Sequence, residues 1–87
     1  MNDAALSNRI LALLTEVAPD VDAATVDPNV EFRRQFDFDS MDTLNFAIAL
    51  SKEYHIDIPE QDYKALRSVS ACSDYVGQAL AKQKSGK

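Results

Sequence analysis

The sequence predicts an all-α fold: a four-helix bundle with three longer helices, one short helix and a long loop between the first two. Two observations carry this prediction. Apolar residues recur at helical spacing in three separate segments, and a composition with two glycines, three prolines and no tryptophan favours helices. A chain of 87 residues has room for one small domain, because it hides only roughly 60–65% of its unfolded surface on folding.

The first helix is indicated by one apolar stripe: Leu6, Ile10, Leu13, Leu14 and Val17. Asp3 is a suitable N-cap for it, and Pro19 ends it. Residues 20–39 show no sustained period, so we expect a long loop there, and loops of this length in small domains are usually functional. Five apolar residues could pin this loop to the core: Val21, Val26, Val30, Phe32 and Phe36.

The second helix is predicted to begin at Asp39 or Ser40 and to end near Tyr54. Asp39 can cap it, and Asp42 places a carboxylate in its first turn, near the positive end of the helix dipole. Two apolar stripes lie on roughly opposite sides of this helix. The larger stripe should face the core: Thr43, Phe46, Ala47, Leu50 and Tyr54. From the smaller stripe, which is Met41, Leu44 and Ile48, we expect at least Met41 and Ile48 to be exposed beside Ser40.

An extended bridge containing Ile56 and Ile58 follows, and Pro59 suits the first position of a short third helix over Glu60 to Leu66. The last helix should begin near Ser68 or Ser70. Its apolar residues at helical spacing are Val69, Cys72, Val76, Ala79 and Leu80.

From Ala81 the chain becomes basic and loses its apolar pattern. We therefore expect a single domain over residues 1–87, with an ordered core of about residues 4–81 and a frayed basic tail over 82–87.

Charge and hydropathy exclude several classes of protein. No apolar run approaches the roughly 20 residues of a membrane-spanning helix, and no leader pattern is visible, so we expect a cytoplasmic, soluble protein. The net charge is −5, and residues 35–62 alone carry −6. A field of this sign repels phosphate backbones and attracts basic protein surfaces, which argues against nucleic-acid binding.

Catalysis needs more parts than this chain supplies. His55 is the only histidine and falls at the end of the second helix, where we expect a capping or solvent-facing role. Cys72 is the only cysteine and lies on an apolar stripe, so it should be a small buried hydrophobe. With no base beside a nucleophile, we predict that the chain is not an enzyme.

Residues 37–42 resemble the start of a calcium loop, with oxygen-bearing side chains at the first, third and sixth positions. The pattern fails further along, because Asp42 stands where glycine is needed and Ile48 where a glutamate is needed. A specific metal site is therefore not predicted, although weak divalent binding by the acidic cluster stays open.

Ser40 places a hydroxyl at the start of a helix, after a long loop and before the smaller apolar stripe. One interpretation makes it an ordinary helix cap. The other makes it an attachment point, because a phosphodiester there would lie at the positive end of the helix dipole, near unpaired backbone N–H groups. Local physics alone leaves both open.

Several motifs together resemble the acyl carrier protein family of phosphopantetheine-binding carrier domains. They are Asp39-Ser-Met-Asp-Thr-Leu44, Ala49-Leu50, Glu53-Tyr-His-Ile-Asp-Ile-Pro-Glu60, Ser68-Val69 and Asp74-Tyr-Val76, with Phe32 in the loop. The resemblance covers roughly residues 5–80. It implies an acyl-carrier-like four-helix bundle that is a carrier and not an enzyme.

The resemblance also implies the cofactor and its site. In this family a serine, here Ser40, carries 4′-phosphopantetheine, which a separate Mg²⁺-dependent phosphopantetheinyl transferase takes from coenzyme A. Asp39 would be the neighbouring carboxylate that helps this transferase to hold its metal and substrate. Acyl groups would then be carried as thioesters on the terminal thiol, in fatty-acid, lipid or polyketide-type biosynthesis.

Further roles follow from the same resemblance. Acyl-loading and acyl-processing enzymes would dock on the second helix, at Met41, Asp42, Leu44 and Ile48. Phe46, Ala47, Leu50 and Tyr54 would line the core or an acyl cavity. We expect a monomer, with no nucleic-acid partner and no stable membrane insertion.

The chain also departs from the family pattern. Phe36-Asp37 replaces a Leu-Gly pair, and Arg33 and Arg34 stand where acidic or apolar residues are usual. The second helix is less acidic, with Asn45, Ser51 and Lys52 where carboxylates are common. Because several missing ion pairs can redirect the choice of partner, we hypothesise a specialised carrier, with a housekeeping carrier as the alternative within the family. An unmodified helical adaptor that docks through the second helix is the alternative outside it.

Overall fold

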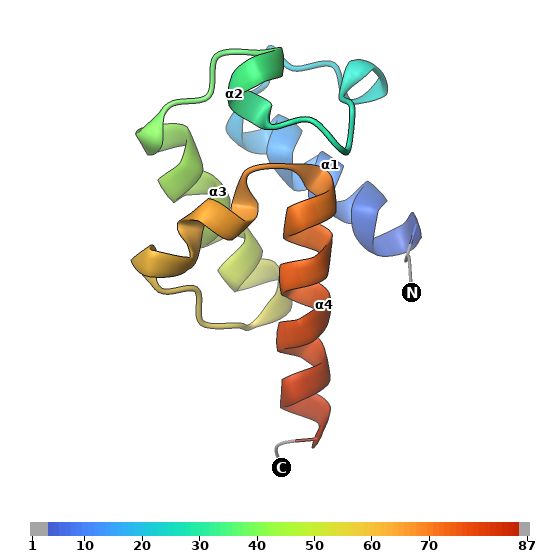
Figure 1. The fold of residues 1–87 in the computed structure, drawn as a ribbon, viewed down its shortest axis with the longest axis vertical. Coiled ribbons are helices and arrows are strands. Elements are labelled where there is room, and N and C mark those ends of the chain that lie inside the picture. The colour runs from blue at the N-terminus through green and yellow to red at the C-terminus, as the bar shows by residue number, and fades with distance from the viewer. Residues whose placement is uncertain (1–3, 86–87) are drawn as a thin grey trace.

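The computed structural model describes residues 4–85. In chain order its elements are α1 (Ala4–Val17), η1 (Ala23–Thr25), α2 (Phe32–Gln35), α3 (Ser40–Tyr54), η2 (Glu60–Leu66) and α4 (Val69–Ser85). The three longer helices, α1, α3 and α4, frame the molecule, while α2 and η2 are short elements in the connections (Figure 1). The predicted all-α fold of three longer helices and a short one is confirmed, and within residues 4–85 no helix is long and apolar enough to cross a membrane.

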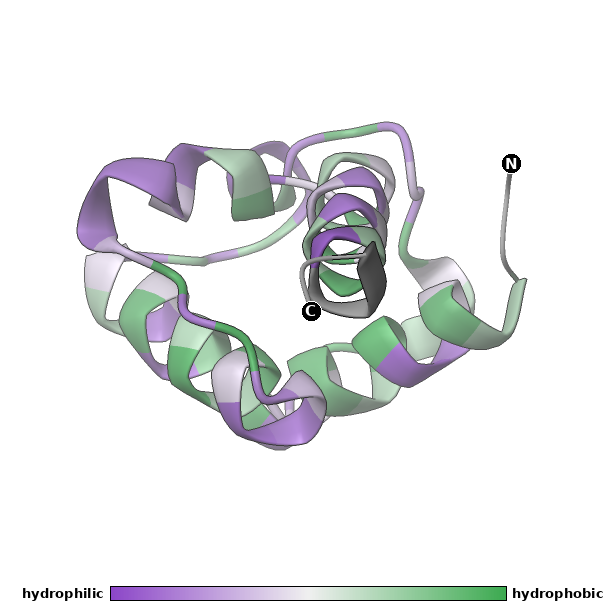
Figure 2. Cartoon of the chain, turned by 90° about the horizontal axis from the view of Figure 1, so that it is seen from below, coloured by the Kyte–Doolittle hydropathy of each residue, from purple (hydrophilic) through white to green (hydrophobic). Residues whose placement is uncertain are grey.

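α1 packs against both α3 and α4, and the view along α4 shows α1 and α3 converging beside it (Figure 2). The stripe predicted for α1 is the face it buries, through Ile10, Leu13 and Leu14. The helix ends at Val17, shortly before Pro19, as expected from the lack of a proline N–H. The N-cap role predicted for Asp3 lies outside the described residues.

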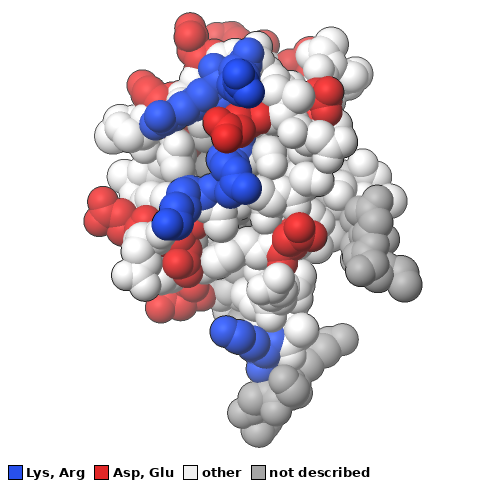
Figure 3. Space-filling model, in the orientation of Figure 1, with Lys and Arg blue, Asp and Glu red and all other residues white. Residues whose placement is uncertain are grey.

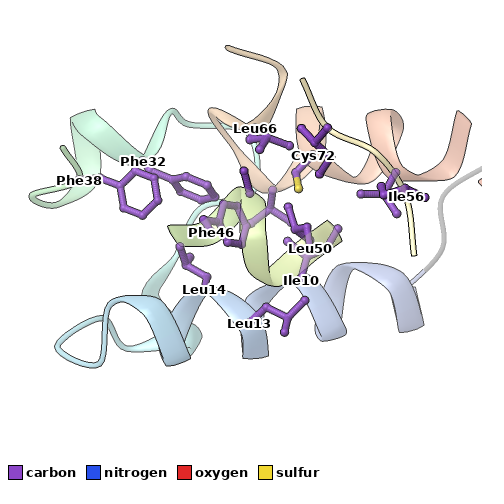
Figure 4. Close-up of a cluster of buried hydrophobic side chains, with 14 residues drawn as sticks. Ile10, Leu13, Leu14, Phe32, Phe38, Phe46, Leu50, Ile56, Leu66 and Cys72 are labelled. Atoms are coloured by element: carbon purple, nitrogen blue, oxygen red, sulfur yellow. The ribbon is translucent and has the colours of Figure 1, made fainter. Parts of the chain in front are cut away.

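The core is assembled from side chains of every longer helix and of the loop. Phe46 and Leu50 of α3 lie between residues of α1 on one side and Leu66 and Cys72 on the other (Figure 4). Both side chains are 0% exposed, so each contributes about 1.5–3 kcal/mol relative to an exposed position. Burial therefore fixes which face of α3 turns inward and which face stays outside.

The connection between α1 and α3 is more ordered than its sequence suggested. It contains η1 and α2, two helical turns too short to produce a visible period, so the expectation of an irregular loop throughout residues 20–39 is wrong there. Gln35 braces this segment, because its side-chain amide donates to the carbonyls of Asp27 (2.8 Å) and Val30 (2.7 Å) and accepts from the Asp27 N–H (2.8 Å).

Four of the five apolar residues predicted to pin this connection reach the core; Val30 is half-buried but is not among the residues packed against it. Phe32 is 0% exposed, and Val21, Val26 and Phe36 pack against the core while partly buried. The sequence interpretation missed Phe38, which is also buried and lies edge-on to Phe32, with ring centroids 5.1 Å apart. Phe32 in turn lies edge-on to Phe46 at 5.8 Å, so an aromatic chain ties the connection to α3.

η2 has the predicted bounds, but its turns are 3₁₀ rather than α. Pro59 is its N-cap in an extended conformation instead of its first helical residue. The Tyr75 hydroxyl of α4 donates to Asp62 Oδ2 at 2.7 Å, which fastens the short helix to the long one.

α4 begins at Val69, and Ser68 supports its first turn by accepting a hydrogen bond from the Ala71 N–H at 3.1 Å. Val69, Cys72 and Val76 are buried, as their spacing predicted. The helix continues through Ser85, so it includes residues 82–85 of the basic tail, whose fraying stays a prediction. Once a helix is anchored, each further residue of good helix propensity extends it at little cost, even without an apolar face. Residues 86 and 87 lie outside the described range.

Candidate functional site

The start of α3 is closed by two aspartates. Asp39 is the N-cap, and its side chain accepts a hydrogen bond from the Asp42 N–H at 3.0 Å. Asp42 Oδ2 accepts from the Asp39 N–H at 3.2 Å, which completes a capping box. The Asp39 carbonyl accepts from the Thr43 N–H at 3.0 Å, so Asp39 satisfies two donors of the first turn.

Ser40 is the first residue of α3 and is exposed. Because Asp39 performs the capping, the interpretation of Ser40 as an ordinary cap is wrong. The hydroxyl stands in the first turn of α3, at the positive end of the helix dipole. A phosphate ester on this oxygen would be favoured by that field, so the residues present fit the attachment of a phosphodiester.

The outer stripe of α3 follows directly from this point. Met41 is 61% and Ile48 is 45% exposed, and they are the two large hydrophobic side chains that stand out as exposed in the described part of the chain. Leu44, between them, is half-buried. The predicted exposure of Met41 and Ile48 is confirmed, and it places an apolar line beside Ser40.

The residues expected to line the core or an acyl cavity are core residues. Phe46, Ala47 and Leu50 are at most 2% exposed, and Tyr54 is partly buried and packed against them. None of them lines the pocket that opens next to Ser40.

That pocket has a volume of about 400 Å³ and lies between α2, the start of α3 and η2. Phe32, Phe38, Tyr63 and Leu66 give it an apolar lining, and Ser40 and Thr43 form its α3 side. Its charged lining residues are Glu31, Arg33, Glu60, Lys64 and Arg67. Sequence reasoning did not find this pocket, because its walls come from segments that only the fold brings together. The signals available were the unusual Arg33 and the excess of basic residues after residue 63.

His55 and Cys72 have the structural roles predicted for them. His55 is the exposed C-cap of α3 in the left-handed conformation (φ 55°), and its N–H donates to the Ser51 carbonyl. Cys72 is 0% exposed, and burial raises the pKa of its thiol to about 12. A thiol in that environment is not a nucleophile at neutral pH.

The segment that resembled a calcium loop has the wrong geometry for one. From Ser40 onward it is helical, so it cannot wrap its oxygens around a cation, and the Asp42 carboxylate is engaged in the capping box. Over the residues that the structure describes, no three Asp, Glu, His or Cys side chains form a group that could hold a metal ion.

Comparison with known proteins agrees with this arrangement. A family model described as a phosphopantetheine attachment site matches residues 8–76. The acyl carrier protein of Thermosynechococcus vestitus is 25% identical over 81 residues, which cover 93% of this chain and 99% of that protein. The mitochondrial acyl carrier protein of Saccharomyces cerevisiae is 29% identical over 59 residues, 68% of this chain and 47% of that protein. The chain thus belongs to the acyl carrier protein family, whose members bear 4′-phosphopantetheine and are carriers rather than enzymes.

Proposed function

We propose that this chain carries acyl groups as thioesters on 4′-phosphopantetheine attached to Ser40, and that it presents them to partner enzymes of fatty-acid, lipid or polyketide-type biosynthesis. One observation supports the choice of residue: Asp39 caps α3, so among the residues that the structure describes no helix cap uses the exposed Ser40 hydroxyl. The positive helix end at Ser40 and the pocket beside it support the same choice.

Attachment needs a phosphopantetheinyl transferase. Ser40 Oγ forms a bond to the phosphorus that bears the pantetheine arm of coenzyme A, as the bond to adenosine 3′,5′-bisphosphate breaks. The hydroxyl proton passes to a base of the transferase. Asp39 is exposed, and its Oδ1 accepts a hydrogen bond from the Asp42 N–H. Its second carboxylate oxygen, Oδ2, can therefore face the metal of the docked transferase.

Partner enzymes dock on the outer face of α3 in this proposal. Met41 and Ile48 offer apolar contacts, Leu44 lies between them, and Asp42 adds a negative charge close to Ser40. A tethered thiol delivered to a docked enzyme reacts at high effective concentration, so each docking contact can be weak and reversible.

The proposed carrier is a single domain over residues 1–87 that acts as a monomer in the cytoplasm, where coenzyme A is available. We assign it a specialised pathway. Its support is the charge pattern: Asn45 and Lys52 are exposed on α3, and Arg33 and Arg34 are exposed on α2, where a general carrier would be acidic or apolar.

The attachment is tested by intact-mass measurement. After incubation with coenzyme A, Mg²⁺ and a broad-range transferase, the chain should gain the mass of one phosphopantetheine, and Ser40→Ala should gain nothing. Ser70→Ala, which removes another exposed serine at a helix start, should load like the unmodified sequence. If the wild-type chain gains no mass, the alternative function, an unmodified helical adaptor, is the one supported. If Ser40→Ala gains the mass, the attachment site is elsewhere.

Specialisation is tested separately on the loaded protein. Enzymes of general fatty-acid synthesis should load and elongate it poorly, whereas enzymes encoded beside it should accept it. Full exchangeability with a housekeeping carrier would show that it serves general fatty-acid synthesis.

A further inference from the structure

The pocket beside Ser40 combines two kinds of surface. Phe32, Phe38 and Leu66 are buried core residues whose edges form an apolar floor, with Tyr63 at one side. Three cationic side chains also line the pocket: Arg33 from α2, Lys64 from η2 and Arg67, the residue that follows η2 as its C-cap. A ligand that fits both surfaces has a short apolar stretch and an anionic group.

Two of the three cationic side chains that line the pocket are not engaged in ion pairs with described residues. Among the residues whose side chains the structure describes, 4–82, Arg33 and Lys64 have no ion-pair partner. Arg67 is loosely paired, with its Nε 3.9 Å from Glu31 Oε2, and its Nη1 donates to the Lys64 carbonyl at 3.0 Å. That second contact holds the Arg67 guanidinium along η2, near Lys64.

Three of the nine Lys and Arg residues of this chain, whose net charge is −5, line the pocket. Lys and Arg side chains gather over α2 and η2 on the face shown, with acidic side chains between them (Figure 3). On α1, by contrast, Arg9 forms a bidentate ion pair with Glu53: its Nε and Nη2 each donate to one Glu53 carboxylate oxygen at 2.8 Å. The charge of Arg9 is therefore already paired. Glu31 and Glu60 also line the pocket, which leaves one net positive charge at its rim.

We infer that this pocket holds the acyl cargo, and that the cargo is a dicarboxylic acyl group whose free carboxylate is bound by Arg33, Lys64 and Arg67. The inference rests on the proposed attachment at Ser40, which itself lines the pocket. A group tethered there has a far higher effective concentration in the pocket than any free ligand, so exposed charge contacts that are individually weak can hold it. A fully apolar acyl chain would use the floor and leave the three cations without a role.

The test compares two cargoes of equal carbon number on the full-length chain. A broad-range transferase loads Ser40 from glutaryl-coenzyme A or from valeryl-coenzyme A, and intact mass verifies each product. Hydroxylamine then cleaves the thioesters at neutral pH and low salt. Each rate is divided by the rate of the same acyl-coenzyme A, which removes the intrinsic difference between the two acyl groups.

Sequestration of the carboxylate predicts that the normalised rate for glutaryl is about two- to five-fold lower than for valeryl, the factor expected from exposed charge pairs. The difference should vanish in 0.5 M salt and in the triple variant Arg33→Gln, Lys64→Gln, Arg67→Gln. Arg34→Gln is the matched control, because Arg34 lies in the same turn of α2 but does not line the pocket, and it should keep the difference.

The outcomes separate the two proposals. A chain that gains no mass overturns the attachment at Ser40 and this inference with it. This inference alone is overturned if a loaded chain shows equal normalised rates for the two cargoes, or if the difference survives in the triple variant. The three cationic side chains would then be assigned to the binding of an acidic partner surface.

Discussion

Asp39 and Asp42 each accept a hydrogen bond from the other's backbone N–H, at 3.0 and 3.2 Å, across the first turn of α3. Ser40 lies between them in the chain and takes no part in this exchange. The two aspartates therefore cap the helix, which leaves the Ser40 hydroxyl available for the proposed attachment of phosphopantetheine. Because different residues serve the two purposes, mutations can test the stability of the helix start and the proposed modification separately.

Asp39→Ala should lower the free energy of unfolding by about 0.5–2 kcal/mol, because the N-cap is lost. Asp39→Asn should preserve stability, since asparagine is an equally good cap. If the carboxylate charge also assists the transferase, both variants should load phosphopantetheine more slowly. Urea unfolding measures the first effect and time-resolved intact mass the second. Loading of Asp39→Asn at the wild-type rate would show that Asp39 is only a cap.

Ser40→Ala should change the free energy of unfolding by no more than about 0.5 kcal/mol, as is usual at exposed positions without a structural role. The serine hydroxyl caps nothing, and alanine has the better helix propensity. Urea denaturation of the unloaded protein measures this, with Asp39→Ala as the destabilised reference. A loss comparable to that of Asp39→Ala would mean that Ser40 supports the fold after all.

Cys72 should not react with thiol reagents in the native, unloaded protein. Its pKa is raised to about 12 by burial, so at pH 8 the thiolate fraction is on the order of 10⁻⁴, and the sulfur is also 0% exposed. A chromogenic disulfide should therefore detect no thiol before loading, one after loading, and two when the loaded chain is unfolded. Loaded Cys72→Ala keeps the arm thiol as the only one. Rapid native reaction of the unloaded chain would contradict the buried placement of Cys72.

The helices and the start of α3 could be predicted because each depends on local signals. The Asp39 and Asp42 spacing, the period of Ile10, Leu13 and Leu14, and the position of Pro19 all act within a few residues of the boundary they set. The outward position of Met41 and Ile48 followed from a simple competition, because a small bundle could not bury both faces of one helix.

The pocket could not be predicted in the same way. Its floor depends on Phe38, whose burial is decided by contact with Phe32 and Phe46 and not by any periodic pattern. Its cationic residues come from α2, from η2 and from Arg67 directly after η2; α2 and η2 are distant in sequence and are brought together by packing on the core. The role of Ser40 as a possible cap was likewise settled only by side-chain geometry, since Asp39 and Ser40 are both good caps by residue type.

The hydrogen bond between the Tyr75 hydroxyl and Asp62 predicts how the free energy of unfolding responds to alkaline pH. The pKa of the Tyr75 hydroxyl is raised to about 12, first by desolvation and then by its hydrogen bond to Asp62. Because the folded-state pKa lies above the ordinary value near 10, the neutral hydroxyl stabilises the fold fully below pH 10. That contribution should be lost as the pH rises from about 10 to about 12.

Tyr75→Phe isolates this effect. It should lower the free energy of unfolding at neutral pH by about 0.5–1.5 kcal/mol, the net value of one hydrogen bond, and should weaken the loss of stability between about pH 10 and pH 12. Tyr63→Phe is the matched control, because Tyr63 lies on η2 without a hydrogen bond to α4 among the residues described. Urea unfolding curves at several pH values measure both variants. An alkaline loss of equal size in wild type and Tyr75→Phe would assign it to groups other than the hydroxyl that joins η2 to α4.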